Sequence, residues 1–239
     1  MTDTGRGAGP DFIEALARGL DVLRSFRPGT PSMTLSEIAV LTSLARPTVR
    51  RILITLEELG YVRVADRGYT LTPRVLELGM TYVNALNMWE VARPHMERLV
   101  AQTNESTSMA QLDGGDIVYV ARVAVPKIVT LAVTIGTRFP APATSMGKVL
   151  LASLPAATLR AVLAEPSRSG INARWQPSAV ELDAALREVR AKGWALADQD
   201  LAPGVRSIAT GVRDGDGRVV AAINVTVHAA ETSVETLLE

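Results

Sequence analysis

Apolar positions in the first third of the chain recur at helical spacing and then alternate. Thr34 and Glu37 stand three residues apart ahead of an apolar run, the arrangement in which each side chain satisfies a backbone N–H at a helix start. After a turn at residues 42–44, Pro47 fits the first turn of a second helix, where its missing N–H costs nothing. Gly60 ends that helix. The sequence therefore predicts a capped helix, a tight turn and a second helix in close succession.

The second predicted helix has one apolar face and one polar face. Residues 61–65 and 69–71 follow it as two short strands around a tight turn. This order of elements is typical of a winged helix-turn-helix, whose second helix enters the major groove of DNA. Ile54 falls on the polar face, and the pattern leaves open whether it packs under the wing or contacts DNA. The apolar face consists of Val49, Ile52, Leu53, Leu56 and Leu59.

We expect contacts to double-stranded DNA to come from the start of this second helix and from the tip of the wing. Arg50 and Thr48 are predicted to read or frame bases. Arg46, Arg51 and Arg67 are predicted to hold phosphates, which position a protein on the duplex. An apolar stripe or an arginine-bearing face alone is weak evidence. The capping box, short turn, helix-starting proline, arginine pair and wing together make DNA binding the leading hypothesis.

Helices are predicted on both sides of this segment. The first spans residues 11–26 and completes a three-helix core through an apolar stripe. The second opens at residues 72–73 and continues to about residue 86 as a rigid connector. These patterns divide the chain into a disordered tail (1–10), a DNA-binding domain (11–72), a linker helix (73–87) and a further domain (88–239). The stripe of the first helix consists of Ile13, Leu16, Ala17, Leu20 and Leu23.

The region after the linker alternates between strand-like and helical patterns. A helix around Met96 precedes strands at 106–112, 116–122 and 130–135, then a proline-rich loop at 139–143. Further strands are predicted at 194–198, 207–213 and 219–228, with a hairpin turn at 214–217. Strands on both sides of a run of helices favour an α+β domain with an antiparallel sheet flanked by helices. The intervening helices are predicted at 145–153, 156–163 and 178–192.

Composition restricts the compartment and the mode of DNA binding. The 239 residues include no cysteine, so disulfides are excluded, which fits a reducing cytoplasm. No apolar run is long enough to span a membrane, and no leader pattern opens the chain. We expect a soluble cytoplasmic protein without a membrane partner. The 25 basic and 25 acidic residues cancel, so DNA affinity must come from local placement and from dimerisation.

The catalytic alternatives fail because key residues are missing. His95 and His228 are the only imidazoles, and we interpret both as structural. Gly147-Lys148 resembles a phosphate loop, but proline stands where its first glycine belongs. The acids at 214–217 resemble part of a calcium loop without its final carboxylate, and no nucleophile elbow surrounds Ser145. We therefore expect no catalysis, no metal and no cofactor.

Small polar residues mark the strands near the end of the chain. Asn224, Thr226 and His228 alternate along the last strand and share one face, and Ser207 begins the preceding strand. A few polar groups in an apolar setting are typical of a small-molecule site. The alternative is an exposed sheet face satisfied by water, and the period alone favours that alternative.

The chain resembles the IclR family of bacterial transcription regulators over nearly its whole length. The segment at 15–23 and Leu56-Glu-Glu-Leu-Gly-Tyr-Val62 carry the resemblance in the first domain. Thr144-Ser-Met-Gly-Lys148 and the segments at 193–209 and 221–226 carry it in the second. Within the family, residues 116–122 and 135–140 are most similar to regulators of protocatechuate, 4-hydroxybenzoate and β-ketoadipate catabolism.

The resemblance implies a winged helix-turn-helix, a dimerising linker helix and a GAF-like domain that binds a small organic acid. Ser207 stands where some members have Cys, and Gln199 where many have Glu, so the ligand's identity does not transfer. With no Arg or Lys placed in the pocket, we expect hydrogen bonds from Ser207, Asn224 and backbone N–H groups to hold the ligand's carboxylate. The residues implied for effector binding are Met146, Gly147, Asp198, Ser207, Asn224 and Thr226.

The sequence thus predicts a transcription regulator whose operator binding responds to a small organic acid and which acts as a homodimer or tetramer. The alternative is a ligand-binding sensor or enzyme that uses its helix-turn-helix for protein contacts. Binding to a specific palindrome at moderate salt would separate these interpretations. Repressor and activator remain equally possible, because that property depends on where the operator lies.

Overall fold

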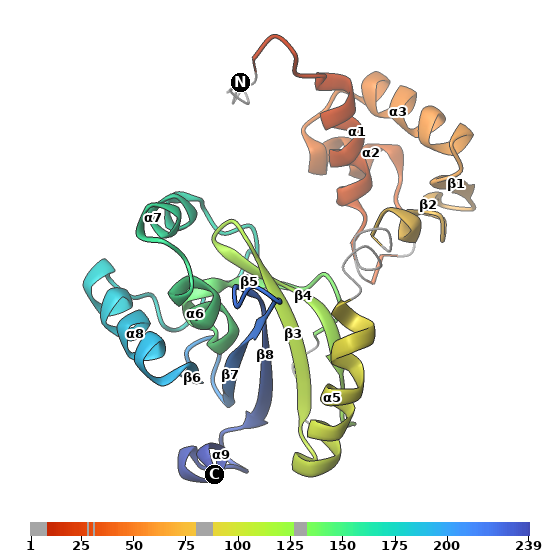
Figure 1. Cartoon of the computed structure of the whole chain (residues 1–239). Helices are drawn as coiled ribbons and strands as arrows, with labels where there is room; N and C mark the ends of the chain where they lie inside the picture. Colours follow the sequence, from red (N-terminus) through yellow and green to blue (C-terminus); the bar gives the residue numbers. More distant parts are fainter. Residues whose placement is uncertain (1–8, 28, 31, 80–87, 127–132) are drawn as a thin grey trace. The chain divides into compact units, whose positions relative to one another are not determined.

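The computed structural model describes residues 9–27, 29–30, 32–79, 88–126 and 133–239. The chain divides into two compact units, Met1–Ala85 and Leu86–Glu239, which are described in turn (Figure 1). Residues 75–79 are helical, as predicted for the start of the linker, while residues 80–87 and most of the tail lie outside the described residues. The boundaries of tail and linker therefore stay predictions.

The N-terminal unit has the predicted order of elements. The helices are α1 (Glu14–Ser25), α2 (Leu35–Thr42) and α3 (Arg46–Glu58), and the wing consists of β1 (Val62–Ala65) and β2 (Gly68–Leu71). The capping box is confirmed, because the Thr34 side chain accepts from the backbone of Glu37 and the Glu37 carboxylate accepts from the Thr34 N–H at 2.7 Å. The fully buried side chains of this unit include Val22, Ile38, Val49, Leu53 and Val62.

Two details of the predicted apolar faces are wrong. On α1, Ile13, Leu16 and Leu20 are exposed, and Val22 supplies the buried contact instead. Helical spacing shows which residues share a face but not which face packs, and α1 meets the core through its C-terminal half. Leu59 is also exposed, because it follows the last residue of α3 and lies past the end of the buried face.

The wing is joined to the segment before α2. Met33 and Tyr69 exchange two backbone hydrogen bonds at 2.8 and 2.9 Å. Gly68 makes this approach possible: a Cβ at this position would lie 2.3 Å from the carbonyl oxygen of Met33, and the residue has a positive φ of 134°. Only glycine tolerates both conditions. The wing is thereby held in register with the start of the helix-turn-helix.

The C-terminal unit is built on a six-stranded antiparallel sheet with strand order β5-β4-β3-β8-β7-β6. Helices α6 and α8 lie on one side of this sheet and α5 on the other (Figure 1). The α+β prediction is confirmed. The strands are β3 (Ser106–Asp113), β4 (Asp116–Val123), β5 (Arg138–Pro140), β6 (Trp194–Asp198), β7 (Val205–Arg213) and β8 (Val219–His228).

The helices of this unit follow the sequence signals closely. Helix α8 has a second capping box, between Ser178 and Glu181, and ends at Gly193 with a φ of 79°. All eight residues of α6 are buried, which makes it the central helix of the core. The helices are α5 (Met88–Thr103), η1 (Ala141–Ala143, a 3-10 turn), α6 (Ser145–Ala152), α7 (Ala156–Ala164), α8 (Ala179–Lys192) and α9 (Val234–Leu238).

The strand predicted at 130–135 is wrong where it is described. Residues 133–137 form a turn, while residues 127–132 lie outside the described part. The strand that pairs with β4 is β5, within the segment predicted as the start of a loop. The β-branched residues around 130 raise strand propensity, but Gly136 adopts a positive φ of 87° and turns the chain. Pairing partners, rather than propensity, decide this segment.

Candidate functional site

The first candidate surface is the start of α3 together with the wing tip. Arg46, Arg50, Arg51 and Arg67 are exposed, and Thr48 is half-buried. The ion pairs found among the described residues of this unit join Arg18 with Glu14, and Arg74 with Glu77, so they engage none of those four arginines. The surface therefore presents four guanidinium groups that have no ion-pair partner among the described residues, on a motif that enters a DNA groove.

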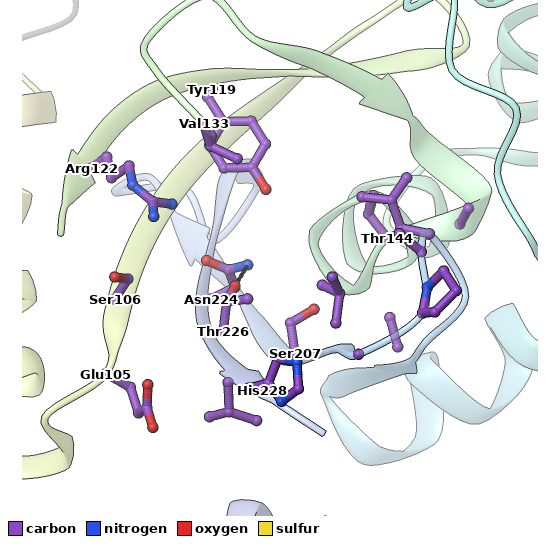
Figure 2. A pocket seen from close by; sticks show the side chains of 18 residues that line it. Glu105, Ser106, Tyr119, Arg122, Val133, Thr144, Ser207, Asn224, Thr226 and His228 are labelled. Atoms are coloured by element: carbon purple, nitrogen blue, oxygen red, sulfur yellow. Dashed lines mark hydrogen bonds between the residues drawn. The ribbon is translucent and has the colours of Figure 1, made fainter. Parts of the chain in front are cut away.

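The second candidate site is a pocket of about 260 Å³ between the sheet and the N-terminus of α6 (Figure 2). Ser207, Asn224, Thr226 and His228 all line it, so the alternating residues of the last strand do share one face. The interpretation of this face as water-exposed is therefore wrong, because the helices and a loop cover it. The apolar part of the lining includes Tyr119, Val133, Ala143, Ala197, Leu201 and Val205.

The Asn224 amide is held in one orientation at the floor of the pocket. Its Oδ1 accepts from the backbone N–H of Ser108 at 3.1 Å, and its Nδ2 donates to Thr226 Oγ1 at 2.9 Å. An amide nitrogen carries two N–H groups, so a second donor is available. Asn224 is only 4% exposed, and an unpaired buried polar group is costly. A ligand with an acceptor atom fits this position.

Donors also converge where α6 begins. The hydroxyls of Ser145 and Ser207 lie 2.7 Å apart. Thr144 caps the helix by accepting from the N–H of Gly147 at 3.0 Å. The N–H groups of Ser145 and Met146 belong to the first turn and have no partner within the helix. Because a helix N-terminus carries partial positive charge, this end of the pocket favours an electron-rich group.

Arg122 brings a guanidinium into the pocket, and the expectation that no Arg or Lys lies inside is wrong. The cause is a β-bulge: the register shifts between Met109 and Ala110 of β3, which leaves Val120 of β4 as the inserted residue. In a regular strand, side chains three residues apart point to opposite faces. The bulge instead places Tyr119 and Arg122 on the same side. Alternation alone therefore could not find Arg122.

Burial shifts the pKa values of both Tyr119 and Arg122. Burial raises the pKa of Tyr119 to about 12, so its hydroxyl stays neutral and able to donate. Burial lowers the pKa of Arg122, partly offset by Tyr119. Arg122 donates to the neutral hydroxyl of Ser108 at 3.1 Å, which uses one of its five N–H donors. A partly desolvated guanidinium next to a cavity favours an anionic ligand. The carboxylate of Glu105 also lines this cavity and favours the opposite charge.

Three of the residues implied for effector binding do not line the pocket. Met146 is fully buried in the core. Gly147 packs against the turn η1, where a Cβ would lie 2.0 Å from the carbonyl oxygen of Ala141. Asp198 accepts from Arg206 Nε at 2.8 Å, and this bond holds the pKa of the carboxyl below its usual range. Met146 and Gly147 thus serve packing, and Asp198 forms an ion pair with Arg206.

A loop between β6 and β7 covers the pocket, and Lys148 anchors it. Lys148 Nζ lies 2.6 Å from Asp200 Oδ2, donates to the Leu196 carbonyl and lies over the Trp175 ring, 4.5 Å from its centroid. The Gly147-Lys148 pair is thus a packing element. Gly204 of the loop packs against His228, whose Nδ1 accepts from the Ala230 N–H at 3.3 Å. His228 also lines the cavity, so its interpretation as a structural residue stays a prediction.

Together, a winged helix-turn-helix with exposed arginines and a separate domain with a ligand-sized pocket define the class of effector-responsive transcription regulators. Two family models match the chain: the IclR helix-turn-helix domain over residues 15–66 and the C-terminal domain of bacterial transcriptional regulator IclR over residues 80–238. The chain belongs to the IclR family of bacterial transcriptional regulators.

Two relatives align with this chain over most of their own length. The Pca regulon regulatory protein of Pseudomonas putida is 39% identical over 220 residues, which cover 92% of this chain and 76% of that protein. The p-hydroxybenzoate hydroxylase transcriptional activator of Acinetobacter baylyi is 32% identical over 223 residues, covering 90% and 81%. Both similarities extend across the DNA-binding and the C-terminal units.

Solved structures agree with the fold. A transcriptional regulator from Rhodococcus sp. RHA1 is 48% identical, with a TM-score of 0.82 over 95% of this chain and 91% of that one. An IclR homologue from Microbacterium hydrocarbonoxydans, crystallised with 4-hydroxybenzoate, is 24% identical, with a TM-score of 0.79 over 94% and 93%. The second likeness supports the fold alone.

The described part of the chain contains no helix that is both long and apolar enough to cross a membrane. Within the same residues, no group of three or more His, Cys, Asp or Glu side chains is placed to hold a metal ion.

The close packing of Gly147 against Ala141 predicts that a larger residue at this position lowers stability. Gly147→Ala forces α6 away from η1 and should lower the free energy of unfolding of the C-terminal unit by about 1–3 kcal/mol, as overpacking does. Denaturant titration followed by tryptophan fluorescence measures this, because Trp89, Trp175 and Trp194 all lie in that unit. Gly215→Ala is the control, since nothing lies within 4 Å of its added Cβ. Equal effects of the two substitutions would contradict the account.

Proposed function

We propose that this chain binds operator DNA as a dimer or a pair of dimers, and that a small organic acid in its pocket changes the operator affinity. We further propose that it controls an operon for aromatic-compound catabolism in the cytoplasm and does not catalyse a reaction. The observation that carries the proposal is Arg122, a partly buried guanidinium that lines a ligand-sized pocket.

The charge balance supports association of two or more chains on the operator. The chain carries no net charge, so long-range attraction to DNA is weak. A single α3 and wing supply only a few phosphate contacts. Doubling these contacts in a dimer multiplies the electrostatic gain and matches the two halves of a palindromic site. Oligomers of this chain are therefore part of the proposal.

The relatives indicate the class of ligand. The printed names of two of them refer to the Pca regulon and to p-hydroxybenzoate hydroxylase. We propose that an aromatic acid or a ring-cleavage product places its carboxylate on Arg122. The polar group at the other end of the ligand then lies at hydrogen-bonding distance from Ser207 and the N-terminus of α6. The Asn224 amide donates a hydrogen bond to the ligand from the floor of the pocket.

The DNA assignment predicts different effects for base-reading and phosphate-binding arginines. Arg50→Ala should reduce discrimination at one base pair by about 1–3 kcal/mol. Arg67→Ala should weaken binding almost equally for all sequences and reduce the slope of affinity against salt by about one. Titrations of matched and mutated operators at several salt concentrations measure both. Unchanged affinity and specificity in both Arg50→Ala and Arg51→Ala would rule out α3 as the recognition helix.

The pocket assignment predicts which substitutions weaken acid binding. Hydrogen bonds to a charged group contribute about 1.5–3 kcal/mol each, so Arg122→Gln should weaken binding roughly ten- to a hundred-fold. Ser207→Ala and Asn224→Ala should weaken it too. Calorimetry with protocatechuate, 4-hydroxybenzoate and β-ketoadipate measures these effects, with the exposed Arg160→Gln as the matched control.

Two results would contradict the pocket assignment in different ways. If an acid binds and none of the three pocket substitutions weakens it more than Arg160→Gln does, the ligand binds elsewhere. If no organic acid changes either thermal stability or operator affinity, the proposal of effector sensing is itself wrong.

A further inference from the structure

Recognition helix α3 exposes one large apolar side chain among its arginines. Ile54 is 47% exposed, whereas Leu53 beside it is fully buried. Ile54 follows Arg50 by four residues and Arg51 by three, so it lies one turn further along the same side of the helix. Pro47, Arg51 and Ile54 form a stripe at helical spacing, and all three are exposed.

Within the described residues of its own unit, Ile54 lies outside the apolar core. It is absent from the apolar cluster that α1, α2, α3 and the wing form together, and from the half-buried side chains packed against that cluster. Val64 on β1 of the wing is itself 60% exposed. Of the two alternatives that the sequence leaves open, packing under the wing therefore has no support.

The neighbours of Ile54 limit what it can contact. Thr55 uses its hydroxyl within the helix, donating to the carbonyl of Arg51 at 3.0 Å. An isoleucine side chain neither donates nor accepts hydrogen bonds. Among the groups that base edges present in the major groove, the 5-methyl of thymine is the apolar one. An exposed apolar side chain on a groove-facing helix matches that methyl group.

We propose that Ile54 reads a thymine in each half of the operator by contact with its 5-methyl group. This inference rests on the proposed function, because it requires α3 to enter the major groove. It adds a specificity-determining residue that forms no hydrogen bond and carries no charge. The contact covers apolar surface of both partners and contributes sequence preference without altering the number of phosphate contacts.

The test replaces thymine by uracil, which removes only the methyl group. An operator is first selected from random duplexes with the full-length chain, and each thymine is then changed to uracil singly. We expect one position per half-site at which the wild type loses about fourfold in affinity, the value for one buried methyl-sized group. The Ile54→Ala chain should bind the thymine and uracil duplexes equally at that position.

Leu59→Ala is the matched control, because Leu59 is similarly exposed at 51% but follows the end of the same helix. It should keep the wild-type preference for thymine. If every thymine-to-uracil change affects wild type and Ile54→Ala equally, the inference is overturned while DNA binding stands. If no operator can be selected at all, the proposed function and this inference fail together.

Discussion

The close approach of α6 to the turn before it sets the geometry of the C-terminal unit. At Gly147, the helix backbone meets the Ala141 carbonyl with no room for a side chain. Because of this contact, the whole of α6 packs closely against the sheet, and all eight of its residues are buried. It also brings the helix N-terminus, with Thr144 and Ser145, to the edge of a cavity instead of to solvent. The pocket follows from how tightly this helix is packed.

The opposite end of the pocket depends on an irregularity in the sheet. Without the bulge at Val120, the guanidinium of Arg122 would point to the side where α5 packs, among Met96 and Met109. A charged group there would lack solvation and partners, which is strongly unfavourable. With the bulge, the charge lies next to the cavity and beside neutral donors. One extra residue in a strand thus decides whether the Arg122 guanidinium faces the apolar core or the cavity.

Local signals explain why much of the fold can be predicted from sequence. The Thr34–Glu37 box, the Pro47 helix start and the alternation of β8 act over a few residues, and the structure contains all three. The errors arise where distant contacts decide. Ile13, Leu16 and Leu20 share a helical face that the described residues of their unit leave exposed. The segment that pairs with β4 as a strand is β5, not the one predicted at 130–135.

The residues of the candidate site also divide into those that local signals predict and those that distant contacts position. Ser207, Asn224 and Thr226 could be found because strand alternation places them together, and the structure brings them to one pocket. Arg122 could not, since its position depends on a bulge that shows only in the pairing of β4 with β3. Met146, Gly147 and Asp198 are part of the family signature, and in this chain they serve packing and an ion pair. A signature can therefore mark the support of a site as well as its lining.

We propose that the acid in the pocket and the operator on α3 influence each other's binding. Linkage requires this influence to be reciprocal. Calorimetry should therefore be used to measure the acid's affinity for the free full-length chain and for the chain bound to its operator. We expect these two affinities to differ by the same factor by which the acid changes operator affinity. Equal acid affinities with and without operator would contradict it.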